Sequence, residues 1–261
     1  MIKKHSYLTL ILILIFFSTG AQIPQSNQQI QIGFEEKQGQ YISLDAKLVN
    51  ENKDTVIMAD LLGMPTILNL VYFRCPGTCS PLMWGIAKFI ERVDLKPGVD
   101  YQILTISFDH TERIDLGIQK KENYISSLQD KSLAAGWHFF VTDSINIAKI
   151  TQSAGFNFQW LVDQYSHPTG LIALAPDGKI TRYLRGIDFL PFDIKITLIE
   201  AASGKVGPSI NRLLAMCYSY DKKGNQFVFN VTKVSAILIT FMSLVILAFL
   251  VFKRKNVKKE I

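Results

Sequence analysis

The stretch PTILNLVYFRCPGTCSPLMWGIAKFIERV, residues 65–93, contains two cysteines between an apolar run and an amphipathic segment. Residues 65–73 are mostly apolar and are bounded by Pro65 and the cysteine loop, as expected of a strand that is buried on both faces. Residues 80–93 repeat apolar side chains at helical spacing. Cys75 and Cys79 therefore lie between the end of a buried strand and the start of a helix, which is where open α/β sheets place their functional sites.

The segments around this stretch continue the alternation of strands and helices. The predicted strands are an early hairpin (41–49 and 54–62), a second buried strand (100–108), a short strand (137–141) and a late hairpin around a Pro-Asp-Gly turn (169–186). The predicted helices are 112–128, 144–154 with Ser144 as its cap, and 192–202 with Gly204 past its end. This order predicts an α/β fold with parallel crossovers, and the final antiparallel hairpin makes the sheet mixed.

The net charge of +6 does not indicate a nucleic-acid surface. Seven of the 28 basic side chains lie near the two ends of the chain, so that residues 6–252 carry equal numbers of Lys+Arg and Asp+Glu. A domain without excess positive charge lacks the electrostatic footprint of a nucleic-acid-binding protein. We therefore expect no nucleic-acid partner.

Both ends of the chain have the pattern of membrane-directed segments. Residues 1–20 combine a basic start, an apolar stretch and small residues, which is typical of a signal peptide; an uncleaved anchor is the alternative. Residues 234–252 carry no charge and are long enough to cross a bilayer as a helix, and the basic tail 253–261 is expected in the cytoplasm. The sequence thus predicts a protein of the cytoplasmic membrane with a single C-terminal span and its main domain on the extracytoplasmic, periplasmic side.

Three parts are expected between these ends. They are a polar, Gln-rich flexible arm (21–40), the α/β domain (41–204) and a membrane-proximal extension (205–233). The extracytoplasmic compartment permits disulfides, so a pair of nearby cysteines can be oxidised, reduced or bound to a metal there. The chain has three cysteines, so one is left over from any pair.

The spacing of Cys75 and Cys79 is C-x-x-x-C. Thioredoxin-like oxidoreductases use C-x-x-C, so the extra residue argues against an ordinary thioredoxin, although it does not forbid a disulfide. Two thiolates are also too few for structural zinc, which takes four ligands. They suit Cu(I), with an imidazole to complete a site of low coordination number that also serves Cu(II).

A copper site therefore depends on a histidine that reaches the cysteine loop. His138 lies inside an apolar strand, where a structural role is expected, and His110 follows a strand at the same sheet edge as the loop. His167 directly precedes the late hairpin. If the first strand of that hairpin lies antiparallel beside the cysteine strand, His167 faces Cys75 and Cys79; otherwise it is an exposed loop histidine.

With these residues assembled, the chain resembles the Sco/SenC family. The stretches that carry the resemblance are LVYFRCPGTC (70–79), ILTISFDHTE (103–112), GWHFFVTD (136–143), the His167 loop, LAPDGKITRYLRGIDFLPFDIK (174–195) and LLAMCYSYD (213–221). The resemblance implies a thioredoxin-like fold, tethered to the membrane, that delivers copper to the CuA centre of cytochrome c oxidase and reduces cysteines there. The last two stretches resemble a bacterial branch with a C-terminal membrane helix.

The resemblance also implies roles for individual residues and partners. Cys75, Cys79 and His167 would be the copper ligands, and the two cysteines would alternate between dithiol and disulfide as a redox pair. The implied partners are the copper-bearing subunit of cytochrome c oxidase, a thiol-disulfide reductant and the lipid bilayer.

The chain departs from the family pattern at two positions. Ser80 separates Cys79 from the proline that often follows it directly, and His110 stands where branch members commonly have proline. Neither change removes a ligand, and His110 is a candidate for an additional one.

Three further residues are candidates for a supporting role. Asp109 and Asp163 are expected either to orient the site from outside it or to be solvated loop residues. Cys217 is expected to be either an extra thiolate or a buried, unreactive thiol.

Two other functions remain open from the residues. An extracytoplasmic thiol-disulfide oxidoreductase would use the Cys75–Cys79 pair without a metal, with Pro168 in the place of the cis-proline of thioredoxins. A structural disulfide in an adaptor protein would keep the pair oxidised. A peroxidase is disfavoured, because no Thr or Arg constellation surrounds the cysteines.

Overall fold

The computed structural model describes residues 32–207, 218–221 and 226–229, together with residues 235, 239, 242 and 243. All of them belong to one compact unit, Ile32–Ile261. The predicted signal peptide, most of the arm, Cys217, the basic tail and, apart from four single residues, the predicted span lie outside the described residues. In the described part of the chain, no helix combines the length and the apolar character needed to cross a membrane.

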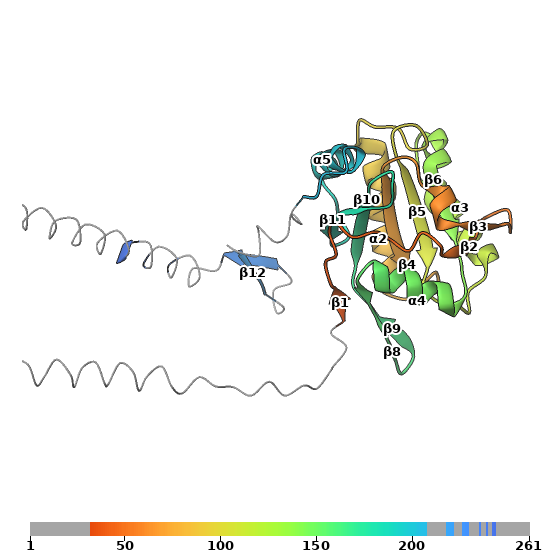
Figure 1. Ribbon diagram of the computed structural model, residues 1–261, viewed down its shortest axis with the longest axis horizontal. Coiled ribbons are helices and arrows are strands. Elements are labelled where there is room, and N and C mark those ends of the chain that lie inside the picture. Colours follow the sequence, from red (N-terminus) through yellow and green to blue (C-terminus); the bar gives the residue numbers. More distant parts are fainter. Residues whose placement is uncertain are drawn as a thin grey trace, which may run out of the picture. The chain divides into compact units, whose positions relative to one another are not determined.

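A five-stranded mixed sheet forms the centre of the domain (Figure 1). Its strands, in spatial order, are β11 (Ile180–Arg185), β10 (Gly170–Leu174), β4 (Thr66–Val71), β5 (Gln102–Ser107) and β6 (Trp137–Phe140). β4, β5 and β6 are parallel, and β10 is antiparallel to both of its neighbours. β4 and β5 are buried at every position, as the apolar runs in the sequence predict.

The described residues form four α-helices. They are α2 (Cys79–Arg92), α3 (Ile114–Ile125), α4 (Ser144–Ser153) and α5 (Pro191–Ala202). α2 and α3 are consecutive crossovers between parallel strands, so the right-handed rule places them on the same face, and α2 contacts both α3 and α5. The order of elements and the mixed sheet that the sequence predicts are confirmed, and the fold is α/β and thioredoxin-like.

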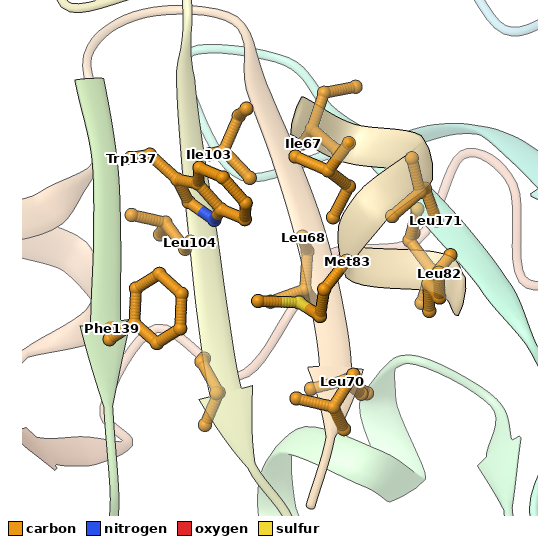
Figure 2. Close-up of a cluster of buried hydrophobic side chains, with 14 of the residues drawn as sticks. Ile67, Leu68, Leu70, Leu82, Met83, Ile103, Leu104, Trp137, Phe139 and Leu171 are labelled. Carbon is orange, nitrogen blue, oxygen red and sulfur yellow. The ribbon is translucent and has the colours of Figure 1, made fainter. Parts of the chain in front are cut away.

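One part of the core lies between α2 and the sheet. In Figure 2, Met83 of α2 points over the sheet toward Trp137 and Phe139 of β6. The indole Nε1 of Trp137 donates a hydrogen bond of 2.9 Å to Thr105 Oγ1, which satisfies the polar atom of a fully buried ring. The same sheet face thus anchors α2 and, with it, the cysteine at its first turn.

The starts of α2, α3 and α5 differ by one or two residues from the predicted starts, and the cap of α4 differs from the predicted cap. The pattern places the start of the second helix at Ser80 or Pro81, but α2 begins at Cys79, so this cysteine is itself the first helical residue. The cap of α4 is Asp143 rather than Ser144, because the Asp143 carboxylate accepts a hydrogen bond of 2.9 Å from Asn146 N.

Further short strands form two-stranded sheets that are separate from the central sheet. The expected early hairpin is present as β2 (Lys47–Val49) and β3 (Thr55–Ile57), and the 3-10 helix η1 (Met58–Leu61) follows it. A second 3-10 helix, η2 (Lys131–Gly136), lies between α3 and β6. Further pairs are β1 (Gly33–Phe34) with β7 (Phe156–Asn157), β8 (Gln159–Leu161) with β9 (Gln164–Ser166), and β12 (Tyr218–Asp221) with β13 (Gln226–Phe229). β1 lies before Tyr41, where the sequence places the start of the domain. Phe34 of β1 packs edge-on against Phe156 and Tyr183, so residues 33–34 are ordered on the domain rather than part of a flexible arm.

Candidate metal centre

Cys75 and Cys79 lie between the end of β4 and the start of α2. The chain leaves the sheet after Val71 and turns at once, because Cys75 N donates a hydrogen bond of 3.2 Å to Tyr72 O. Cys75 is partly exposed, whereas Cys79 is buried with 4% of its surface exposed. Both are free thiols in this structure.

His167 comes from a separate element and faces both sulfurs. β10 lies antiparallel to β4 with Ile172 opposite Leu68, so the start of β10 is beside the end of β4. Across this junction, His167 Nε2 lies 3.9 Å from Cys75 Sγ and 3.6 Å from Cys79 Sγ. The three possible ligand atoms all lie within 4.8 Å of one another. The topology on which the sequence hypothesis depended is therefore present, and it brings the three residues together.

The imidazole of His167 is held in the tautomer that a metal ligand needs. Its Nδ1 lies 2.8 Å from Pro168 O, and a carbonyl oxygen only accepts, so Nδ1 carries the proton. The unprotonated lone pair is then on Nε2, the atom that faces the sulfurs. The rings of Tyr72, Phe108 and Phe156 pack around the imidazole at centroid distances of 5.7, 5.3 and 6.2 Å.

The two thiols share one negative charge unequally. A hydrogen bond from the Cys79 thiol, with a further bond from Gly77 N, lowers the pKa of Cys75 to about 3. The same bond to Cys75, together with burial, raises the pKa of Cys79. Cys75 is therefore the thiolate and the nucleophile, and Cys79 is the neutral partner.

This asymmetry predicts how each cysteine reacts with pH. In the metal-free, reduced protein, we expect iodoacetamide to label Cys75 almost as fast at about pH 5 as at about pH 7, since a pKa of about 3 leaves it ionised at both. Cys79 is expected to stay unlabelled, and mass spectrometry of the modified peptides separates the two. Cys79→Ala removes the hydrogen-bond donor and raises the pKa of Cys75, so labelling should then slow markedly at the lower pH. A wild-type rate that falls in proportion to acidity between the two pH values would show that Cys75 is an ordinary thiol.

The other candidate residues do not join this group. Asp109 is buried, and its Oδ1 accepts from Thr111 N at 2.9 Å. His110 is exposed in the turn after β5, and Asp163 is exposed in the β8–β9 hairpin. None of these three is among the metal-ligand group found in the described residues. His138 is half-buried on β6, and burial together with the charge of Lys121 lowers its pKa, as expected of a structural histidine.

A cleft of about 480 Å³ opens beside the cysteine loop. Its walls are Tyr72, Arg74, Pro76, Asp109, Thr111, Trp160, Asp163 and Tyr165. The β8–β9 hairpin that contributes Trp160 was not predicted, because its turn at Val162 contains no Gly or Pro and Val162 itself adopts a φ of 23°. The cleft leaves room for a partner molecule on the side of the loop that carries the partly exposed Cys75.

Several known proteins are similar to this chain in sequence or in fold. No protein-family model matches the chain. The SCO1 protein homolog of Bacillus subtilis is 20% identical over 161 residues, which are 59% of this chain and 79% of that protein. A solved structure described as a putative electron transfer protein of Aquifex aeolicus matches with a TM-score of 0.58 at 22% identity, over 64% of this chain and 95% of that one. A SCO1/SenC family lipoprotein of Bacillus anthracis matches with a TM-score of 0.52 at 17% identity, over 64% of this chain and 98% of that one.

Proposed function

We propose that the chain is a membrane-tethered, copper-binding protein of the Sco/SenC family that supplies copper to the CuA centre of cytochrome c oxidase outside the cytoplasm. The observation that carries the proposal is the junction of Cys75, Cys79 and His167, whose three ligand atoms lie within 4.8 Å of one another. The similarity to the Bacillus subtilis SCO1 homolog and the motifs around these residues support the family assignment.

The donor set favours copper over the other metals of extracytoplasmic proteins. Two sulfurs and one imidazole nitrogen are one ligand short of structural zinc, and the group contains no carboxylate that would suit calcium or magnesium. Thiolates bind the soft Cu(I) ion well, and the imidazole also suits Cu(II). The unprotonated Nε2 of His167 and the thiolate of Cys75 need little proton release before they bind a metal.

The same geometry suits delivery rather than permanent storage. A site with three ligands leaves coordination positions open, so thiolates of a partner can enter before the first ligands leave. Cys75 is partly exposed beside the cleft, which gives such a partner access. The partner that this chemistry fits is the copper-bearing subunit of the oxidase.

The proposed location rests on the two chain ends. A signal peptide at 1–20 and a span at 234–252 would hold the domain on the periplasmic side of the cytoplasmic membrane. The basic tail 253–261 supports this orientation.

A thiol-disulfide reductase is the second candidate, and the unequal thiols favour it. The Cys75 thiolate would attack a partner disulfide, one partner sulfur would leave as a thiolate, and Cys79 would resolve the mixed disulfide, leaving Cys75–Cys79 oxidised and the partner reduced. A thiol reductant would then restore the dithiol. This chemistry does not need the imidazole of His167, which distinguishes it from copper delivery.

Copper transfer to the client tests the proposal. The purified full-length protein is loaded with one equivalent of Cu(I) and mixed with the copper-free, reduced copper-bearing subunit of the oxidase. After the two proteins are separated, the subunit should contain copper when it was mixed with the wild type or with the matched control His110→Ala, whereas mixing with Cys75→Ser should leave it without copper. Metallation by Cys75→Ser at the wild-type rate would overturn copper delivery through this site, and reduction of an oxidised subunit by the metal-free protein would favour the second candidate.

A further inference from the structure

We infer that Glu112 is the positioning residue of the metal centre, because its carboxylate fixes the backbone of the turn that carries Cys75. This inference rests on the proposed function and deepens it by assigning a residue outside the three ligands. Glu112 lies in the turn between β5 and α3, far from both cysteines in the sequence.

Glu112 binds two consecutive backbone amides. β4 pairs with β5 only as far as Val71 opposite Ser107, so Phe73 and Arg74 lie beyond the ladder. The amide of Phe73 donates to Glu112 Oε2 and the amide of Arg74 to Glu112 Oε1, each at 2.7 Å. The two oxygens of one carboxylate thus replace the sheet partner that the chain loses where it turns toward Cys75.

The rest of the carboxylate is also saturated. Ser107 Oγ donates to Oε2 at 2.6 Å, and Arg74 Nε lies 3.4 Å from Oε1. The side chain of Glu112 is 0% exposed. A buried carboxylate in which both oxygens accept two bonds each is a rigid anchor, and its removal leaves several donors unsatisfied.

The anchor acts directly on the ligand geometry. Cys75 follows Arg74, while His167 is held by β10 on the other side of the junction. The cysteine loop and the segment that carries His167 are therefore anchored independently, and the distances of 3.9 and 3.6 Å from His167 Nε2 to the two sulfurs depend on both anchors. A turn released from Glu112 can move Cys75 without moving His167. Residues that orient metal ligands in this way typically contribute about ten- to a hundredfold to metal affinity.

Asp109, one of the two acidic residues that the sequence offers for orienting the site, is placed differently. Its Oδ1 binds Thr111, and its Oδ2 lies 3.5 Å from the Arg74 guanidinium. It accepts no bond from the backbone of the cysteine loop among the hydrogen bonds of the described residues. The structure therefore separates two acids of the same turn, of which one holds the loop backbone and the other does not.

Glu112→Gln in the full-length protein tests the inference. Whichever way the amide is turned, its NH₂ group replaces one oxygen and faces two donors. We expect the Cu(I) affinity, measured by competition with bathocuproine disulfonate, to fall by about ten- to a hundredfold. The matched control, Glu122→Gln, should stay within about threefold of wild type. It removes the same charge from an exposed position on α3.

A metal-free measurement separates this inference from the proposed function. Amide hydrogen exchange should show Phe73 and Arg74 protected in the wild type and at least about tenfold less protected in Glu112→Gln, while the amides of β4 and β5 keep their protection. If the wild-type protein binds no Cu(I), the proposed function is contradicted, but the hydrogen-exchange measurement still tests whether Glu112 holds the two amides. Copper affinity that is unchanged in Glu112→Gln, or wild-type amides that exchange freely at Phe73 and Arg74, would overturn the inference.

A second variant covers the case in which Glu112→Gln does not fold. Glu112→Asp keeps the charge but withdraws it by one methylene, so that it no longer reaches both amides. We expect its Cu(I) affinity to fall by about tenfold, and an affinity equal to wild type would count against positioning by Glu112.

Discussion

Replacing Cys79 by serine is expected to lower the affinity for Cu(I) by more than about a hundredfold. Loss of a residue that only supports the ligands typically lowers metal affinity by about ten- to a hundredfold, so the loss of a ligand should exceed that range. Cys79 supplies one of the two sulfurs, and a hydroxyl is a poor ligand for a soft ion. The serine hydroxyl can still donate a hydrogen bond to the Cys75 thiolate, so the variant removes a ligand without removing the bond that lowers the pKa of Cys75. The competition measurement with a Cu(I) chelator reports the change.

Cys217→Ser is the matched control for the loss of a thiol. A site of three ligands predicts the wild-type Cu(I) affinity and stoichiometry for this variant. Lower copper occupancy would instead add Cys217 as a further thiolate, as one of the two sequence hypotheses holds. Cys79→Ser protein that binds Cu(I) as tightly as wild type would exclude the two-thiolate site.

Replacing His167 by alanine is expected to affect Cu(II) more than Cu(I). The imidazole is the ligand that suits both oxidation states, whereas the thiolates hold Cu(I) well without it. We expect Cu(II) affinity to fall by at least about a hundredfold, with loss of the thiolate-to-copper absorption bands, and Cu(I) affinity to fall less. Titration with each ion, followed by visible absorption and chelator competition, measures both effects.

His110→Ala is the control, because His110 is exposed and lies outside the ligand group of the described residues. It should bind both ions as the wild type does. Equal losses in the two histidine variants would mean that imidazole content, rather than the position of His167, governs Cu(II) binding. In the reductase alternative, His167→Ala should still exchange thiols with partner disulfides.

The strands of the sheet could be predicted because their signals are local and strong, and the candidate site followed from the expected pairing of two of them. β4 and β5 are uninterrupted apolar runs, and burial at every position is the physical counterpart of that pattern. The hairpin of β10 and β11 contains a Pro-Asp-Gly turn, which predicts that its two strands are antiparallel. If β10 also pairs antiparallel with β4, as the structure shows, His167 lies beside the end of β4. The pairing of β10 with β4 is therefore what brings His167 to Cys75, although about ninety residues separate them along the chain.

The features that could not be predicted depend on tertiary contacts without a local signature. The β8–β9 hairpin turns at Val162, a β-branched residue at positive φ that no turn pattern favours. Asp143 and Ser144 are both good caps, and only the contact with Asn146 decides between them. Glu112 lies in a polar turn, where a carboxylate is normally expected to be exposed to solvent. It is buried because it binds the amides of Phe73 and Arg74, and no sequence pattern predicts that these amides lie nearby.

X-ray absorption at the copper edge of the Cu(I)-loaded full-length protein tests the central claim most directly, because it counts the atoms that bind the metal. The geometry of Cys75, Cys79 and His167 predicts two sulfurs and one nitrogen around each copper. It also predicts that the nitrogen contribution disappears in His167→Ala, while both sulfurs remain. A wild-type shell with fewer than two sulfurs, or a shell that His167→Ala leaves unchanged, would contradict the proposed metal centre.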